Sequence, residues 1–192
     1  MKKITFWLCF FVAVFSLFIF EISSNEKKAL SYSLEPFSNF INSSFFTPAF
    51  ADSAPISSSE ISEIEDFFSS YVDSSNNYKD DLVDKYSENA IIKRVVIKNS
   101  GEKETVIIPI KRYFSELQKG KKLAKLVRYK NTYSNKTYEK ISEDEYKIKT
   151  IRTPMRDKSG LRAYFIIKRT PNGLKISEEA METTVQRFLE ER

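Results

Sequence analysis

The chain has 192 residues and a formal net charge of +5 at pH 7, from 31 basic and 26 acidic side chains. It contains no histidine and one cysteine, Cys9, which excludes a histidine general base, a Ser-His-Asp triad and, after residue 9, a thiol nucleophile or disulfide. Charges of both signs are interspersed, whereas nucleic-acid binders usually gather basic residues on one face. We therefore predict no catalytic residues, no cofactor, no metal site and no nucleic-acid partner.

The first 51 residues differ in composition from the rest, because eleven of the sixteen phenylalanines and the only tryptophan lie there. A short basic start, Met1-Lys2-Lys3, is followed by an apolar run over residues 4–20. This run is longer than the roughly 7–15 residues of a signal-peptide core and slightly shorter than the roughly 20 of a membrane-spanning helix. A long signal peptide cleaved near Ala51 and a retained membrane anchor are both consistent with it.

Both interpretations predict export across the inner membrane. The protein would then be periplasmic or secreted, or anchored through residues 4–20 with its domain outside the cytoplasm. We divide the chain into a signal peptide or anchor with a Ser/Phe-rich spacer (1–51), a linker (52–59) and one folded domain (60–192).

Three amphipathic helices are predicted early in the domain. Ser57 and Glu60 form a capping-box pattern before a stripe of apolar residues that ends at residue 72. A short second helix is predicted over residues 78–86. A third begins after Pro109, covers residues 110–117 and is predicted to end at Gly120, a residue that favours the left-handed conformation.

The remaining elements are predicted strands, separated by turn sequences. They cover residues 90–98, 103–108, 123–133 with an extension over 137–141, 145–153, 161–170 and 173–184, and residues 185–192 form a frayed helical tail or a strand extension. This order predicts an α+β fold in which a strongly curved, mostly antiparallel sheet wraps on three N-terminal helices. Such a sheet commonly encloses a cone-shaped pocket.

Three segments resemble the nuclear transport factor 2-like superfamily, which includes ketosteroid isomerase-like enzymes and exported bacterial modules. They are residues 82–90 (LVDKYSENA), the helix at 110–117 and residues 173–179 (GLKISEE), where Leu174 replaces a common aromatic. The resemblance covers about residues 57–188. It implies a cone-shaped domain and a homodimer through the outer face of the sheet, while the superfamily hosts enzymes, ligand binders and assembly proteins alike.

Candidate pocket residues are tyrosines and arginines on the predicted helices and strands, because amphipathic side chains with polar tips suit a mixed ligand. They are Tyr71, Tyr86, Tyr113, Arg128, Tyr129, Tyr133, Arg152 and Tyr164. No aspartate falls inside a predicted strand, so the catalytic pattern of ketosteroid isomerase is not carried over. Glu178 and Glu182 share one face of the last strand, which we expect to be solvated.

Three functions follow from these observations. The first is an exported non-catalytic module that binds a small apolar or mixed ligand, or a protein partner, through the conical pocket or the sheet face. The second is an extracytoplasmic isomerase or hydrolase of the ketosteroid isomerase-like type. The third is a membrane-anchored component of a secretion system, although such components usually carry more than three residues before the membrane helix.

Overall fold

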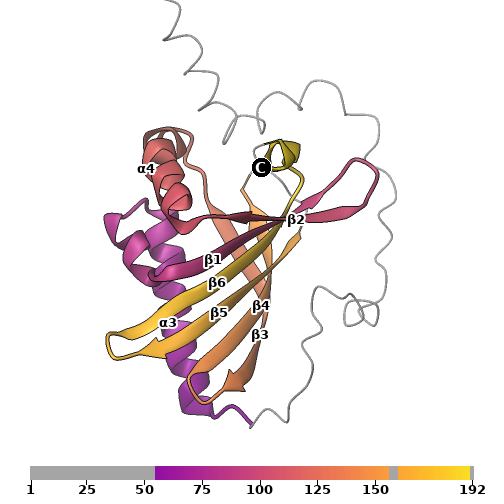
Figure 1. Ribbon diagram of the computed structural model, residues 1–192. Helices are drawn as coiled ribbons and strands as arrows, with labels where there is room; N and C mark the ends of the chain where they lie inside the picture. The colour runs from indigo at the N-terminus through magenta and orange to yellow at the C-terminus, as the bar shows by residue number, and fades with distance from the viewer. Residues whose placement is uncertain (1–54, 156–159, 191–192) are drawn as a thin grey trace, which may run out of the picture.

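The protein is described from a computed structural model that covers residues 55–155 and 160–190. A six-stranded sheet curves around helix α3 (Ser58–Asn76), and helix α4 (Ile110–Leu126) covers one end of the resulting cone (Figure 1). This arrangement confirms the predicted α+β class with a curved sheet. The predicted export segment and the first three residues of the predicted linker lie outside the described residues.

The sheet brings the first and last strands together. Its strands are β1 (Tyr86–Ile97), β2 (Lys103–Ile108), β3 (Asn131–Ser142), β4 (Glu145–Pro154), β5 (Leu161–Thr170) and β6 (Gly173–Thr183). Their spatial order is β2-β1-β6-β5-β4-β3, and only the central β1–β6 pair is parallel. The C-terminal strand therefore joins an N-terminal hairpin to a three-strand meander, and the sheet is complete only when the whole domain has folded.

The hairpin of β5 and β6 follows the prediction from its turn sequence. Thr170 pairs with Gly173, and Gly173 has a φ of +94°, a conformation that side chains other than glycine rarely adopt. The Pro-Asn-Gly sequence thus fixes the register of the longest predicted hairpin through local backbone chemistry.

Four aromatic rings form the centre of the core between α3 and the sheet. The Phe165 ring lies 5.0 Å from that of Phe68, 5.3 Å from that of Tyr71 and 6.0 Å from that of Tyr133, measured between centroids. All three contacts are edge-to-face, the geometry that aromatic quadrupoles favour. The apolar stripe of α3 predicted by helical spacing is therefore the face that packs on the sheet.

Helix α4 is longer than predicted, because Gly120 lies inside it. Gly120 and Ala124 are both buried and stand one helical turn apart, so two small residues face inward at consecutive turns. The predicted strand from residue 123 is wrong over its first part: residues 123–126 are helical and β3 begins at Asn131. Burial of this small-residue face outweighs the glycine's low helix propensity.

Helices α3 and α4 end in the same left-handed motif, with a residue other than glycine at its turning point. After α3, Tyr78 has a φ of +56°, and the Lys79 N–H donates to the Ser74 carbonyl at 2.9 Å. After α4, Arg128 has a φ of +53°, and the Tyr129 N–H donates to the Ala124 carbonyl at 2.9 Å. These are Schellman bonds, which satisfy carbonyls that would otherwise lack partners.

The predicted second helix is a short 3-10 segment, η3 (Asp80–Lys85), and β1 starts at Tyr86, four residues before the predicted strand. The reason is tertiary: the Tyr86 side chain is buried and donates to the Glu179 carboxylate at 2.5 Å, which holds residue 86 in the sheet. The predicted tail becomes another 3-10 segment, η4 (Gln186–Leu189). Within residues 55–155 and 160–190, no helix is both long and apolar enough to cross a membrane.

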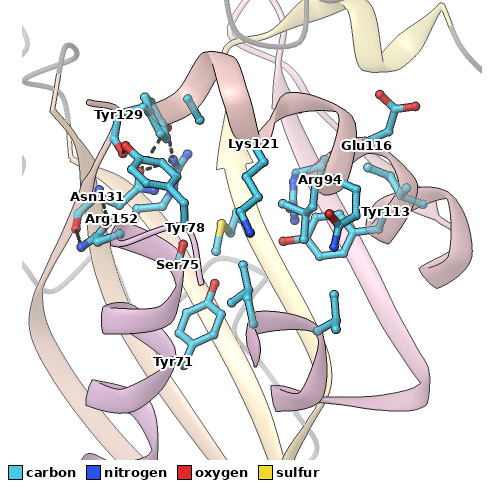
Figure 2. A pocket seen from close by; sticks show the side chains of 18 of the residues that line it. Tyr71, Ser75, Tyr78, Arg94, Tyr113, Glu116, Lys121, Tyr129, Asn131 and Arg152 are labelled. Carbon is cyan, nitrogen blue, oxygen red and sulfur yellow. Dashed lines mark hydrogen bonds between the residues drawn. The ribbon is translucent and has the colours of Figure 1, made fainter. Parts of the chain in front are cut away.

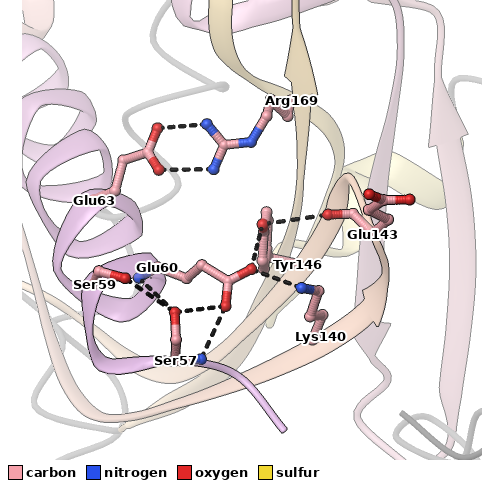
Figure 3. Close-up of polar contacts among 8 residues, drawn as sticks. All are labelled: Ser57, Ser59, Glu60, Glu63, Lys140, Glu143, Tyr146 and Arg169. Atoms are coloured by element: carbon pink, nitrogen blue, oxygen red, sulfur yellow. Dashed lines mark hydrogen bonds and ion pairs between the residues drawn. The ribbon is translucent and has the colours of Figure 1, made fainter. Parts of the chain in front are cut away.

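The predicted capping box is present and also ties α3 to the sheet (Figure 3). The Glu60 carboxylate accepts hydrogen bonds from the Ser57 backbone N–H at 2.8 Å, from Lys140 at 2.7 Å and from the Tyr146 hydroxyl at 2.9 Å. One turn later, the Glu63 carboxylate accepts hydrogen bonds from both terminal nitrogens of Arg169, at 2.8 and 2.7 Å. The start of α3 is thus fixed to β3, β4 and β5 by charged groups.

We expect Glu60→Gln to destabilise the fold at pH 7 and to do so less at pH 3. The Lys140 ammonium, followed by the Ser57 donors, holds the pKa of the Glu60 carboxyl well below its ordinary 4.5. A carboxyl whose pKa is lower in the folded state than in the unfolded state stabilises the fold. This stabilisation is fully present above the unfolded-state pKa, and it is lost as the pH falls toward the folded-state pKa.

Urea denaturation of both proteins at pH 7 and pH 3 measures this difference, with the exposed Glu88→Gln as the control. A Glu60→Gln deficit that is the same at both pH values would contradict the assigned role of the carboxylate.

Candidate functional site

A cavity of about 250 Å³ lies at the end of the cone covered by α4, over the concave face of the sheet (Figure 2). Its walls come from the C-terminal end of α3, from η3, α4 and η4, from the end of β2 and from the inward faces of β1, β3, β4 and β6. Apolar residues from five segments contribute to the lining, including Leu82, Ile108, Leu117, Met181 and Phe188. The space is slightly smaller than the roughly 300–1,000 Å³ of sites for drug-sized ligands, so it suits a small one.

Polar groups gather at two ends of this cavity. At one end, Figure 2 shows Arg152 beside Asn131 and Tyr129; at the other end it shows Arg94 beside Tyr113. Near Arg94 the side chain of Lys121, which is paired with Asp80, also reaches the lining. The two arginines therefore face one cavity from different strands, and their surroundings differ.

The arginine on β1 is neutralised by a buried carboxylate. Glu179, on β6, is fully buried and lies 2.8 Å from Arg94 Nη2. Its other oxygen accepts hydrogen bonds from the hydroxyls of Tyr86 at 2.5 Å and Tyr71 at 3.3 Å. Burial disfavours the charged guanidinium, but the Glu179 carboxylate outweighs it and keeps the pKa of Arg94 above its ordinary value. The positive charge of Arg94 is therefore compensated within the chain.

The tyrosines around this pair remain protonated at neutral pH. Burial, followed by the nearby Glu179 carboxylate, raises the pKa of Tyr113 to about 12 and raises those of Tyr71 and Tyr86 well above 10. Their hydroxyls therefore act as hydrogen-bond donors and acceptors, and they do not supply a phenolate base.

The arginine on β4 has neutral partners only. Its Nη1 donates to Asn131 Oδ1 at 3.0 Å and contacts the Tyr129 hydroxyl at 3.5 Å, and its Nη2 donates to the Glu182 carbonyl at 3.0 Å. Its Nε–H has no acceptor within residues 55–155 and 160–190. Among the described residues, Arg152 has no carboxylate partner, although only 8% of its surface is exposed.

A second hydrogen-bonded layer holds this end of the cavity in place. The side chain of Asn76 pairs with the backbone of Asn131 through two hydrogen bonds of 2.9 Å. The Tyr78 hydroxyl donates to the Tyr129 carbonyl. The two Schellman turns thus bring the end of α3 against the segment that follows α4, and they position the partners of Arg152.

Five of the eight predicted pocket residues line the cavity: Tyr71, Tyr113, Tyr129, Tyr133 and Arg152. Tyr86 does not line the cavity, but it contacts a residue that does: its hydroxyl lies 3.3 Å from the hydroxyl of Tyr113. The structure therefore brings together residues that are up to 81 positions apart in the chain, from Tyr71 to Arg152.

Arg128 and Tyr164 lie elsewhere. Arg128 is the left-handed residue after α4, which turns its side chain into solvent. Tyr164 alternates with the buried Ala163 and Phe165, so it faces the outer side of the sheet, where its hydroxyl donates to Glu178 and its ring centroid lies 4.3 Å from Lys147 Nζ. Neither position contributes to the cavity lining.

Glu179 and Arg94 are site residues that the sequence patterns did not indicate. Glu178 and Glu182 do share the outer face of β6, but Glu178 pairs with Lys93 at 2.7 Å and Glu182 with Arg162 at 2.8 Å, so they are not simply solvated. A register irregularity opposite Ile166 and Ile167 of β5 places both Ile176 and Glu179 on the concave face, which plain alternation does not predict.

This architecture defines the nuclear transport factor 2-like fold, a cone of curved, mostly antiparallel sheet closed by helices. A nuclear transport factor 2-like protein of unknown function from Pseudomonas putida superimposes with a TM-score of 0.51 at 8% identity, covering 67% of this chain and 89% of that one. A nuclear transport factor 2-like protein with a cystatin-like fold from Novosphingobium aromaticivorans gives 0.49 at 10% identity, covering 68% and 89%. No family model and no curated protein sequence matches this chain. At these identities the likeness shows the fold alone.

Proposed function

We propose that the domain is a non-catalytic module that binds a small, partly apolar ligand in the conical cavity. The observation that carries the proposal is the cavity itself, a partly open space of about 250 Å³ lined by apolar and aromatic side chains together with polar and charged ones. Enclosure by apolar side chains with sparse, well-held polar groups is typical of small-molecule sites.

The surroundings of the charged groups favour binding over catalysis. General acid–base chemistry needs a group that can exchange a proton with the substrate. Two carboxylates line the cavity, and both lie beside lysines: Asp80 is paired with Lys121, and Glu116 lies 3.6 Å from Lys119. Behind the lining, the buried Glu179 already engages Arg94 and two tyrosine hydroxyls. Among the described residues no group of three or more acidic or thiol side chains is placed to hold a metal ion.

The cavity is also a better candidate site than the outer face of the sheet. On that face Glu182 contacts both Lys103 and Arg162 at 2.8 Å, so its charge is already balanced within the chain. Dimerisation through this face and export through residues 1–51 both remain predictions from the sequence and its resemblance.

Filling the cavity is expected to abolish ligand binding. Met181 lines the cavity and is 7% exposed, so Met181→Trp places a large ring in the space. Met155, in the turn after β4, is 55% exposed, and Met155→Trp adds the same ring outside the cavity. The full-length proteins are screened against a library of small neutral and charged organic compounds by ligand-observed NMR.

We expect compounds that bind the wild type and Met155→Trp to lose binding to Met181→Trp while the far-UV circular dichroism is unchanged. Compounds that bind all three proteins equally, or a library without any binder, would contradict the cavity as the site.

A further inference from the structure

We infer that the cavity selects a small organic acid, and that Arg152 is the residue that receives its carboxylate. This inference rests on the proposed function and adds the chemical class of the ligand. It depends on the difference between Arg152 and the other cationic side chains that reach the cavity.

Four other cations contribute to the lining. Arg112 is exposed to solvent, and the other three have carboxylate partners within the chain. Arg94 pairs with Glu179 at 2.8 Å, Lys79 pairs with Asp73 at 2.5 Å, and Lys121 pairs with Asp80. These pairs compensate the positive charges. Arg152 is more than nine-tenths buried and has only the neutral oxygens of Asn131, Tyr129 and the Glu182 backbone around it, within the part of the chain that the structure describes.

A buried charge without a counter-charge is unfavourable, because neutral acceptors replace only part of the lost hydration. A guanidinium carries five N–H donors. One of them, the Nε–H of Arg152, has no acceptor in the part of the chain that the structure describes. The guanidinium of Arg152 therefore lacks both a negative partner and one hydrogen-bond acceptor. An anionic ligand would supply both the negative charge and the acceptor.

The protein also holds this guanidinium in a fixed position. Asn131 accepts from it at 3.0 Å and is itself fixed by two hydrogen bonds to Asn76. A planar guanidinium that is held in place is suited to a planar carboxylate. The remaining walls favour the same choice, since Leu82, Ile108 and Met181 offer an apolar surface for the body of the ligand.

A phosphate ester fits these observations less well. Phosphate carries close to two charges at pH 7 and is usually held by several cations or backbone N–H groups. Here Arg94 is neutralised by Glu179, which leaves one buried guanidinium for one negative charge. The geometry thus favours a monocarboxylate with a compact apolar body.

The test compares phenylacetate with phenylacetamide, which has the same shape without the charge, and with inorganic phosphate. Binding to the full-length protein is measured by titration calorimetry. We expect the wild type to bind phenylacetate about 10- to 100-fold more tightly than phenylacetamide, as charge-assisted hydrogen bonds suggest. Arg152→Met should reduce that ratio to about one and leave binding of the amide unchanged, while Arg128→Met, which removes an exposed arginine, should change neither.

The outcomes separate this inference from the proposed function. Equal binding of the acid and the amide to the wild type, or an acid preference that survives in Arg152→Met, would overturn the role of Arg152 while the cavity remains a ligand site. Phosphate binding that is stronger than that of phenylacetate would overturn the carboxylate assignment. If neither organic compound binds but the library identifies others, the acid inference fails and the proposed function stands; if nothing binds, both fail.

Discussion

Replacing Glu179 with alanine is expected to lower the free energy of unfolding by about 3–5 kcal/mol. The substitution leaves the Arg94 guanidinium, whose side chain is 11% exposed, without its counter-charge. It also removes the acceptor of the Tyr86 and Tyr71 hydroxyls, which are buried at the same point. Urea denaturation followed by circular dichroism measures the loss.

Glu178→Ala is a matched control on the adjacent residue. Glu178 pairs with Lys93 on the outer face, where the two side chains are 14% and 27% exposed, and we expect a cost nearer to 1 kcal/mol. The double variant Arg94→Met/Glu179→Leu should recover much of the stability, because it removes both buried charges together. Equal costs for the two glutamates would contradict the assignment of Glu179 to the concave core.

Phe165→Ala is expected to cost a similar amount, about 3–5 kcal/mol, by leaving a cavity in the core. The Phe165 side chain is fully buried and its ring contacts those of Phe68, Tyr71 and Tyr133. Loss of the ring removes apolar burial and three edge-to-face contacts at once. The same denaturation experiment provides the measurement.

Leu126→Ala provides the comparison for this core substitution, since Leu126 is 79% exposed at the end of α4. Its replacement should change the free energy of unfolding by less than about 0.5 kcal/mol. A small loss in Phe165→Ala would mean that the aromatic centre is not the main packing unit of the domain.

Local sequence patterns predicted much of the fold. The capping pair Ser57 and Glu60, the apolar stripe of α3, and the hairpin around Gly173 depend on interactions within a few residues. Such features are largely independent of the rest of the chain, so periodicity and turn chemistry suffice to predict them. Five of the eight proposed pocket residues, which were chosen for their amphipathic side chains, line the cavity.

Where prediction failed, a distant part of the chain had determined the outcome. Gly120 lies within a helix because it and Ala124 are buried in the folded domain, and Arg128 therefore takes the left-handed position that glycine was expected to occupy. The local sequence of a helix does not specify which distant residues it will pack against. Local propensity was outweighed by tertiary burial in this case.

The sequence by itself determined that the domain has no histidine or thiol chemistry. It also determined the α+β class and the order of the strands along the chain. The tertiary structure decided which charges are compensated. Glu179 neutralises Arg94 because an irregular register brings it to the concave face, while Arg152 comes to face neutral oxygens. Charge compensation depends on three-dimensional distances between strands, and no spacing along the chain encodes it.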